Sequence, residues 1–159
     1  RGIDIIRSIP FIILIVLLIP LSRFLVGTGS GVTGSFVALV FGTVPFFARQ
    51  IESVLSEIDH GLVEASAAMG FSPRQIIFGV YLRESIPGIT RVTMITFVSF
   101  VGITAIAGAI GAGGIGDFAI RYGYQMGYRD MIWLTVLIIL AIISIFQFFG
   151  NMIIRRTTH

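Results

Sequence analysis

Few residues in this chain of 159 could carry out chemistry, and none of them forms a catalytic pattern. The two histidines, His60 and His159, have no second ligand at a metal-binding spacing, so we interpret them as a loop residue and a tail residue. The apolar segments contain no paired carboxylates, no Ser-His-Asp arrangement and no zinc-protease motif. The chain also has no cysteine, which excludes a disulfide framework and a thiolate metal site. The sequence predicts no enzyme activity, no metal and no cofactor.

A glycine-rich stretch, residues 111–116, matches the pattern G-x-G-x-x-G. As a dinucleotide fingerprint this pattern needs a preceding strand and an acidic residue about 20 positions further on. Neither is expected here, because the stretch ends a long apolar segment. Irregular backbone at membrane depth is tolerated only where protein or a cavity covers it. We interpret the stretch as an unwound, close-packed region, at a subunit contact or as a gate, and packing is the commoner use.

The elements that position these residues are apolar. Hydrophobic residues make up 55% of the chain, the mean hydropathy is +0.98, and only 12% of residues are charged. Soluble domains carry about 25% charged residues. The sequence therefore predicts an all-α, polytopic membrane protein built as a helical bundle in the lipid bilayer. No Asp, Glu or Lys lies centrally in a span, which argues against ion-driven transport and for energy supplied by another subunit.

Four membrane spans are expected from the uncharged runs. They are Ile9–Val26, kinked at Pro20, a second within Gly27–Ala48 after a glycine turn, a third that begins after Pro87-Gly88 and has no charge from Val92 to Gly116, and Met131–Ile154. The chain begins at an arginine and opens partway into an amphipathic stretch. We expect that an N-terminal segment of the protein is missing.

The net charge of +3 comes wholly from arginine and indicates orientation rather than nucleic-acid binding. If the chain crosses the membrane four times, eight arginines lie on one side of the membrane and three on the other. The first set is Arg1, Arg7, Arg49, Arg74, Arg83, Arg91, Arg155 and Arg156, and the second is Arg23, Arg121 and Arg129. Because positive charge is enriched on the cytoplasmic side, the interval between Arg49 and Arg91 is predicted to face the cytoplasm.

This central interval holds 9 of the 19 charged residues (11 basic and 8 acidic) and predicts two short helices. The first begins after Asp59, a favourable N-cap residue, and runs to Met69, where Gly70 supplies the left-handed residue that commonly ends a helix.

The second helix of the interval has a start signal in its first four residues. Ser72 and Gln75 have the spacing of a capping box, and Pro73 occupies the first helical position. Pro87 and Gly88 are expected to end this helix.

One face of the first short helix carries only small residues, because Gly61, Ala65 and Ala68 are spaced at i, i+4 and i+7. Another backbone could approach this face closely, and the adjacent Glu64 could accept a hydrogen bond or pair with a cation. The spacing alone does not distinguish a docking element from a solvated hairpin with ordinary caps.

The same residues resemble the cytoplasmic EAA signature in permease subunits of bacterial ABC importers. The resemblance lies in Glu64-Ala65-Ser66, in Gly70 six residues after the glutamate, and in Val80 and Leu82. Two positions depart from the signature: Ser66 replaces its third residue, and Arg83 stands where a proline is usual.

Other segments resemble the methionine-importer permease family, so that the resemblance covers essentially all 159 residues. They are residues 7–14 (RSIPFIIL), 44–49 (VPFFAR), 108–116 (GAIGAGGIG) and 122–124 (YGY). The resemblance implies a multi-pass protein of the bacterial inner membrane, with one permease domain over 1–159 and a coupling region over 52–87. It also implies five membrane helices, so the family's first would be missing here. The implied partners are an ATP-binding ABC subunit, a substrate-binding lipoprotein and a second copy of the chain.

In such importers the EAA helix seats in a groove of the ATPase subunit. The resemblance therefore implies coupling roles for the five residues that carry the motif and the small face: Gly61, Glu64, Ala65, Ala68 and Gly70. It also implies methionine as the solute. Alternatives are a permease for another amino acid or small organic solute, and a membrane channel or structural subunit that is not ATP-driven.

The third predicted span also carries hydroxyl side chains, at Thr93, Thr96, Ser99 and Thr104. Such groups usually bond to their own helix or to a neighbouring one. The alternative is that some line a translocation path whose apolar wall is formed by Met94, Phe97 and Phe100.

Overall fold

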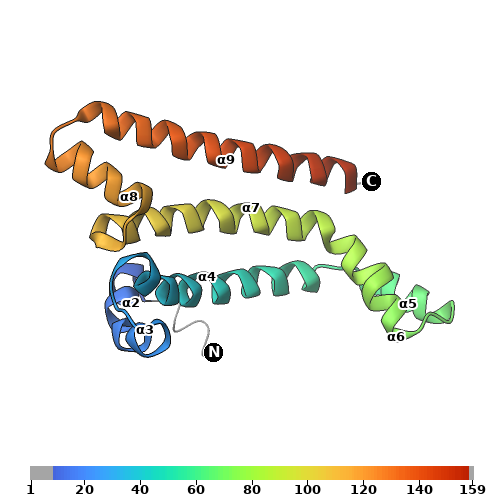
Figure 1. Cartoon of the computed structure of the whole chain (residues 1–159). Coiled ribbons are helices and arrows are strands. Elements are labelled where there is room, and N and C mark those ends of the chain that lie inside the picture. Colours follow the sequence, from blue (N-terminus) through green and yellow to red (C-terminus); the bar gives the residue numbers. More distant parts are fainter. Residues whose placement is uncertain (1–8, 158–159) are drawn as a thin grey trace. The chain divides into compact units, whose positions relative to one another are not determined.

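Three long helices dominate the computed structural model of this protein, which describes residues 9–157 (Figure 1). They are α4 (Gly31–Ser56), α7 (Leu82–Ala107) and α9 (Arg129–Thr157). By length and composition, three helical runs among the described residues could cross a membrane: 31–56, 73–112 and 129–157. A helix of 26 residues is about 39 Å long, more than the roughly 30 Å of a hydrocarbon core. The predicted all-α membrane architecture is confirmed.

Shorter elements connect the long helices. The α-helices among them are α2 (Phe11–Leu17), α3 (Ile19–Val26), α5 (His60–Ala68), α6 (Pro73–Gln75) and α8 (Gly114–Phe118). Two segments are wound as π-helices, η1 (Ile76–Tyr81) and η3 (Ala119–Gln125). A third segment, η2 (Gly108–Ala112), is interrupted by non-helical backbone at Ile110 and Gly111. Because η1 joins α6 directly to α7, the backbone is helical without interruption from the second short helix into the long one.

The described residues divide into two compact units. One contains 9–46 and 96–145, the other 47–95 and 146–157, and the division falls inside α4, α7 and α9. Few apolar side chains are buried, and bulky ones such as Phe24 and Trp133 are 85% and 69% exposed. So large an apolar surface is typical of a chain whose outside meets lipid or partner subunits.

The prediction of one kinked helix over Ile9–Val26 is wrong. The helix stops at Leu17 and restarts at Ile19, and Leu18 between them has φ −90° and ψ 0°. Pro20 lies in the first turn of α3, where its missing N–H costs nothing, and the Ser22 N–H donates to the Leu18 carbonyl at 2.8 Å. The break therefore leaves few unpaired backbone groups.

Neither half of this broken segment reaches a membrane-spanning length, since α2 has 7 residues and α3 has 8. The predicted count of four spans is not confirmed. Arg1, Arg7 and the rest of the predicted lead-in lie outside the described residues.

The second and fourth predicted spans correspond to α4 and α9. A turn precedes α4, and in it Gly27 and Gly31 have φ of +78° and +71°, as the glycine cluster predicts. The helix then continues through Pro45 and ends at Ser56, beyond the predicted segment. The fourth span is longer than predicted by only a few residues at each end.

The prediction that Pro87 and Gly88 end the second short helix is also wrong, because both lie inside α7. A proline in a helix interior costs about 3 kcal/mol or more. A break would instead leave up to four N–H and four C=O groups without intrahelical partners, each costing about 1–3 kcal/mol when buried. The Ser85 hydroxyl donates to the Tyr81 and Leu82 carbonyls, at 2.6 and 3.1 Å, in the turn before the proline. The helix that carries the third span is thus continuous from Pro73 and does not begin after Gly88, as predicted from the sequence.

Candidate coupling site

The short helix α5 begins as the sequence predicts. Asp59 has an extended backbone, with φ −62° and ψ 118°, and its Oδ1 atom accepts a hydrogen bond from the Gly61 N–H at 2.9 Å. This bond satisfies one of the first N–H groups of the helix, which lack partners within it. The N-cap fixes where α5 starts relative to the end of α4.

The end of α5 is a Schellman turn. Gly70 has φ +84°, its N–H donates to the Ala67 carbonyl at 3.0 Å, and the Phe71 N–H donates to the Ser66 carbonyl at 3.2 Å. A residue with a Cβ atom is strained in this left-handed conformation. The glycine spacing of the motif is therefore a requirement of the backbone as well as a mark of resemblance.

The capping box that starts α6 is also confirmed. The Ser72 Oγ atom accepts a hydrogen bond from the Gln75 N–H at 3.4 Å, and Gln75 Oε1 accepts one from the Ser72 N–H at 2.8 Å. The two capped ends, at Gly70 and Ser72, turn the chain sharply between α5 and α6, which Figure 1 shows beside each other.

The helix α5 packs against η1 through one face and leaves the other face open. Ser66 is 4% exposed, and its hydroxyl donates to the Leu62 carbonyl at 2.8 Å. The five residues to which the resemblance assigns coupling roles are all exposed: Gly61, Glu64, Ala65, Ala68 and Gly70. The three atoms nearest to a Cβ atom added to Gly61 all belong to Asp59, the closest at 3.3 Å. The small face is not covered by the described part of this chain and is available to a partner.

Large apolar side chains surround this hairpin, although it lies in the charge-rich part of the sequence. Met69 and Phe78 are 67% and 69% exposed. Further members of this set are Leu62, Phe71, Ile77 and Leu82, each more than 40% exposed. Exposed apolar groups of this size, set among charged residues, are typical of a surface that contacts another protein or the membrane. These residues are not among the predicted site residues, although they stand out in the sequence as bulky residues within the charged interval.

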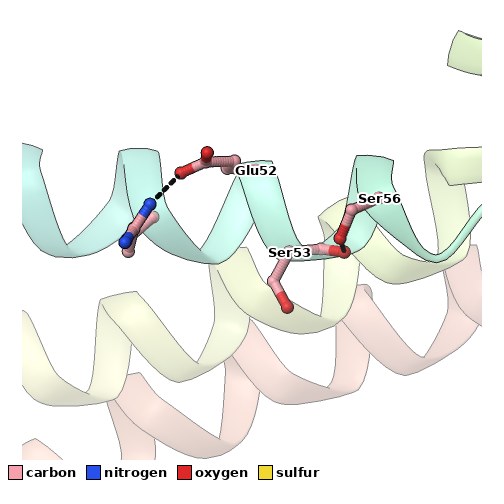
Figure 2. Close-up of polar contacts among 4 residues, drawn as sticks. Glu52, Ser53 and Ser56 are labelled. Atoms are coloured by element: carbon pink, nitrogen blue, oxygen red, sulfur yellow. Dashed lines mark hydrogen bonds and ion pairs between the residues drawn. The ribbon is translucent and has the colours of Figure 1, made fainter.

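The end of α4 that leads into the hairpin is polar. Arg49 and Glu52 form an ion pair of 2.6 Å, and the Ser56 hydroxyl donates to the Ser53 carbonyl at 2.8 Å (Figure 2). Both charged side chains are about half exposed or more, so the pair contributes little to stability. The pair lies just beyond the uncharged run of this helix, which ends at Ala48.

A charged cavity of about 340 Å³ lies within the unit that contains the hairpin. Its walls include the carboxylates of Glu57, Asp59 and Glu84, and the guanidinium of Arg91. Gly88 forms part of the wall, and a Cβ atom there would be 2.5 Å from the Cγ1 atom of Val54. The ends of α4 and α7 are therefore in close contact beside α5.

The glycine-rich stretch in the other unit is unwound, as predicted. Gly111 has φ +94° and Gly113 has φ +84° with ψ −172°, so the chain leaves the helix between η2 and α8. A methyl group on Gly116 would overlap the carbonyl oxygen of Ala105, and one on Gly108 would lie 2.7 Å from the Asp117 nitrogen. The glycines pack one part of this chain against another. The residues before them are helical, so the described chain lacks the strand that a dinucleotide site requires there.

The predicted path residues have different surroundings. Phe100 lines a cavity of about 260 Å³. Phe97 is half-buried and is not among the residues that line this cavity. Met94 packs closely against Gly150 of α9.

Two of the predicted hydroxyl groups bond to their own helix: Thr93 donates to the Ile89 carbonyl at 2.7 Å, and Thr104 to the Val101 carbonyl at 2.8 Å. Thr43 of α4 behaves differently, because its buried hydroxyl has no hydrogen-bond partner among the described residues. Thr43 is not among the predicted residues, since nothing in the sequence separates it from the other threonines.

Comparisons with known proteins agree with these observations. The profile of the family "Binding-protein-dependent transport system inner membrane component" matches residues 1–159. The chain is 43% identical over 153 residues to the probable D-methionine transport system permease protein MetI of Vibrio cholerae, covering 96% of this chain and 68% of that protein. It is 44% identical over 151 residues to the methionine import system permease protein MetP of Bacillus subtilis, covering 95% and 68%.

A solved structure, the inward-facing MetNI methionine ABC transporter, contains a chain that is similar in fold. The TM-score is 0.88 at 42% identity, and the match covers 99% of this chain and 73% of that one. The broken first segment, the capped hairpin and the apolar helices are thus the parts of a multi-pass inner-membrane permease subunit, and the chain belongs to the binding-protein-dependent transport system inner membrane components.

Proposed function

We propose that this chain is the translocation subunit of an ATP-driven importer for methionine, coupled through α5 to a separate ATPase subunit. The observation that carries the proposal is the exposed small face of α5, capped at both ends and not covered by the described residues of its own chain. Two further findings support the proposal. The family profile matches residues 1–159, and two similar proteins are named as methionine transport permeases.

The five coupling residues have distinct roles in this proposal. Gly61, Ala65 and Ala68 let the walls of a groove on the ATPase subunit approach the α5 backbone closely. Glu64, which is exposed beside them, pairs with a cation or accepts a hydrogen bond from the groove. Gly70 sets the angle at which α5 leaves the groove, because its left-handed turn fixes the direction of the chain.

The path of the mechanical signal follows from the packing of α5. Because α5 contacts η1, and η1 is continuous with α7, a displacement of the seated helix moves the start of a membrane span. ATP binding closes the ATPase dimer and draws two seated α5 helices together, and the membrane helices then rock from inward-facing to outward-facing. Met94, Phe97 and Phe100 are proposed as the apolar wall of the path.

The division of labour between subunits completes the proposal. ATP hydrolysis belongs to the ATPase subunit, a substrate-binding lipoprotein delivers the amino acid, and two copies of this chain form the channel. We place residues 52–87 in the cytoplasm as the coupling region of a single permease domain over 1–159.

Reconstitution with partner subunits tests the function. The chain, an ATPase subunit and a methionine-binding lipoprotein are placed in proteoliposomes, and the uptake of labelled L- and D-methionine is measured with and without ATP. We expect ATP-dependent uptake that an excess of unlabelled methionine abolishes and polar amino acids do not. Competition by another solute alone would indicate a permease for that solute. Uptake without ATP, or failure to co-purify with the ATPase subunit, would indicate a channel or a structural subunit.

A further inference from the structure

One side of α9 is exposed over its first three turns. Arg129, Trp133, Leu137 and Leu140 follow one another at i, i+4, i+8 and i+11, so they share one side of the helix. All four residues are exposed, and Leu137 and Leu140 are 62% and 54% exposed. These four residues form what we call the α9 stripe.

The other side of α9 packs against its own chain. Thr135 is 4% exposed, and its hydroxyl donates to the Met131 carbonyl at 2.7 Å. With 3.6 residues per turn, Thr135 lies about half a turn away from Leu137 of the α9 stripe. Of the three helical runs that could cross a membrane, that of α9 is covered least by the described residues. The α9 stripe therefore faces something other than the described part of this chain.

The chemistry of the α9 stripe changes in a fixed order along the helix. Arg129 is a cation, Trp133 is a large ring with one polar N–H, and the two leucines are purely aliphatic. At 1.5 Å per residue, Trp133 lies about 6 Å and Leu140 about 17 Å along the axis from Arg129. A bilayer changes over the same distances, because a headgroup layer of roughly 5–8 Å covers each half of a hydrocarbon core of about 30 Å.

This order matches a phospholipid better than another membrane helix. Helices that pack closely in a membrane meet through small residues, and the α9 stripe has none. Tryptophan is enriched where a membrane helix meets the headgroups. A guanidinium binds phosphate through two parallel hydrogen bonds. Arg129 makes no ion pair within the described part of the chain, and Asp130 lies about a quarter turn to its side.

We propose that the α9 stripe binds a phospholipid of the leaflet in which α9 begins. Arg129 holds the phosphate, the Trp133 indole lies against the ester region, and Leu137 and Leu140 lie along an acyl chain. This surface is an interface with lipid and not with a second copy of the chain. The inference depends on the membrane-embedded fold, and it does not depend on methionine as the solute or on coupling through α5.

The first test uses Trp133, the single tryptophan of the chain. The purified chain is placed in lipid nanodiscs whose phospholipids carry bromine, a contact quencher of indole fluorescence. The bromine is either near the ester end of the acyl chain or near its middle. We expect the shallow bromine to quench Trp133 at least about twofold more than the deep one, because the indole lies at the boundary of the hydrocarbon core.

A second indole position provides the control. Trp133→Phe combined with Leu140→Trp moves the indole about 10 Å further along the helix, so the deep bromine should then quench more than the shallow one. Absence of quenching by either bromine in the parent would overturn the proposal. An indole that only aqueous acrylamide reaches would lie in water, and one that neither quencher reaches would be covered by a second copy of the chain. Stronger quenching of the parent by the deep bromine would also contradict the assigned contact.

The second test concerns Arg129. Quenching of Trp133 is measured in nanodiscs that mix a brominated anionic phospholipid with an unbrominated zwitterionic one, which gives the relative affinity of the α9 stripe for the anionic lipid. Arg129→Gln should lower this relative affinity about fivefold, since it removes one cation from the lipid surface. Arg129→Lys keeps the charge and should retain most of the preference.

Arg121→Gln is the matched control, because Arg121 already pairs with Asp117 at 3.3 Å and lies outside the α9 stripe. We expect this variant to keep the relative affinity of the parent. An unchanged affinity in Arg129→Gln would overturn the proposal. A fall of equal size in both glutamine variants would also overturn it, because the preference would then come from the general charge of the surface.

Discussion

At the scale of single residues, glycines decide where this chain turns and where its segments touch. Gly70 has φ +84° and ends α5, and Gly111 and Gly113 have positive φ where the helix unwinds. Gly116 has an ordinary φ but lies where a methyl group would overlap the Ala105 carbonyl. Gly70, Gly111 and Gly113 are therefore required because their backbone conformation disfavours a Cβ atom. Gly116 is required because a neighbouring segment leaves no room for a side chain.

Gly70→Val tests the first requirement. A left-handed conformation costs a residue with a Cβ atom about 1–2 kcal/mol. We expect the turn after α5 to change and both co-purification with the ATPase subunit and ATP-dependent uptake to fall several-fold. Gly70→Asn is the matched control, because asparagine tolerates this conformation and should retain most of the uptake. Full uptake by the valine variant would count against a role for this turn in coupling.

Gly116→Val tests the second requirement. Inserting bulk into a packed contact costs about 1–3 kcal/mol or more, so the melting temperature of the purified chain should fall by several degrees. Gly102 offers a control in α7, since a Cβ atom there would meet nothing within 4 Å. Gly102→Ala should raise stability by about 0.5–1 kcal/mol, because alanine is the better helix former. A scan of thermal unfolding in detergent measures both variants.

At the scale of elements, α5 is a short helix whose position depends on its caps and its neighbour rather than on its own length. Isolated helices shorter than about 12 residues are marginal in water. The Asp59 cap, the Gly70 turn and the contact with η1 together hold its 9 residues. These contacts can therefore hold the small face of α5 in a fixed position while that face stays exposed.

Adding bulk to this face should separate docking from folding. In the double variant Ala65→Leu and Ala68→Leu, we expect normal thermal stability, because both positions are exposed. Binding to the ATPase subunit should weaken at least tenfold, since two large side chains would hold the groove away from the backbone. Ala67→Leu, also exposed but on another face of α5, should bind nearly as well as the parent. Equal binding by all three proteins, measured by titration in detergent, would contradict the proposed seat.

At the scale of the whole molecule, charge and helix length together suggest how the protein is oriented in the membrane. Among the described residues, six arginines lie in the unit that contains the hairpin, and three lie in the other unit. The six are Arg49, Arg74, Arg83, Arg91, Arg155 and Arg156, and the three are Arg23, Arg121 and Arg129. This imbalance does not depend on whether the broken first segment crosses the membrane.

The orientation can be measured with two exposed serines at the ends of α4: Ser30, which precedes the helix, and Ser56, its last residue. We expect an impermeant maleimide to label Ser56→Cys in inside-out vesicles and Ser30→Cys in right-side-out vesicles, because α4 is long enough to span the membrane between them. The parent chain, which has no cysteine, gives the background. The reverse pattern would place the coupling hairpin outside the cell and exclude its proposed role.

The class of the protein and the local signals of its candidate site follow from the amino-acid sequence alone. Low charge and high hydropathy required membrane helices, and the caps at Asp59, Gly70 and Ser72 required the two-helix hairpin, because these effects act within a few residues of the chain. Whether a helix breaks or continues at a proline depended instead on the surroundings of that proline. Pro20 sits at a helix break and Pro87 lies within a continuous helix, since the balance between a proline's cost and that of unpaired backbone groups is set by distant contacts. Only the tertiary structure could show that the small face of α5 is uncovered and that Thr43 has no partner among the described residues, because exposure and hydrogen bonding depend on which segments pack together.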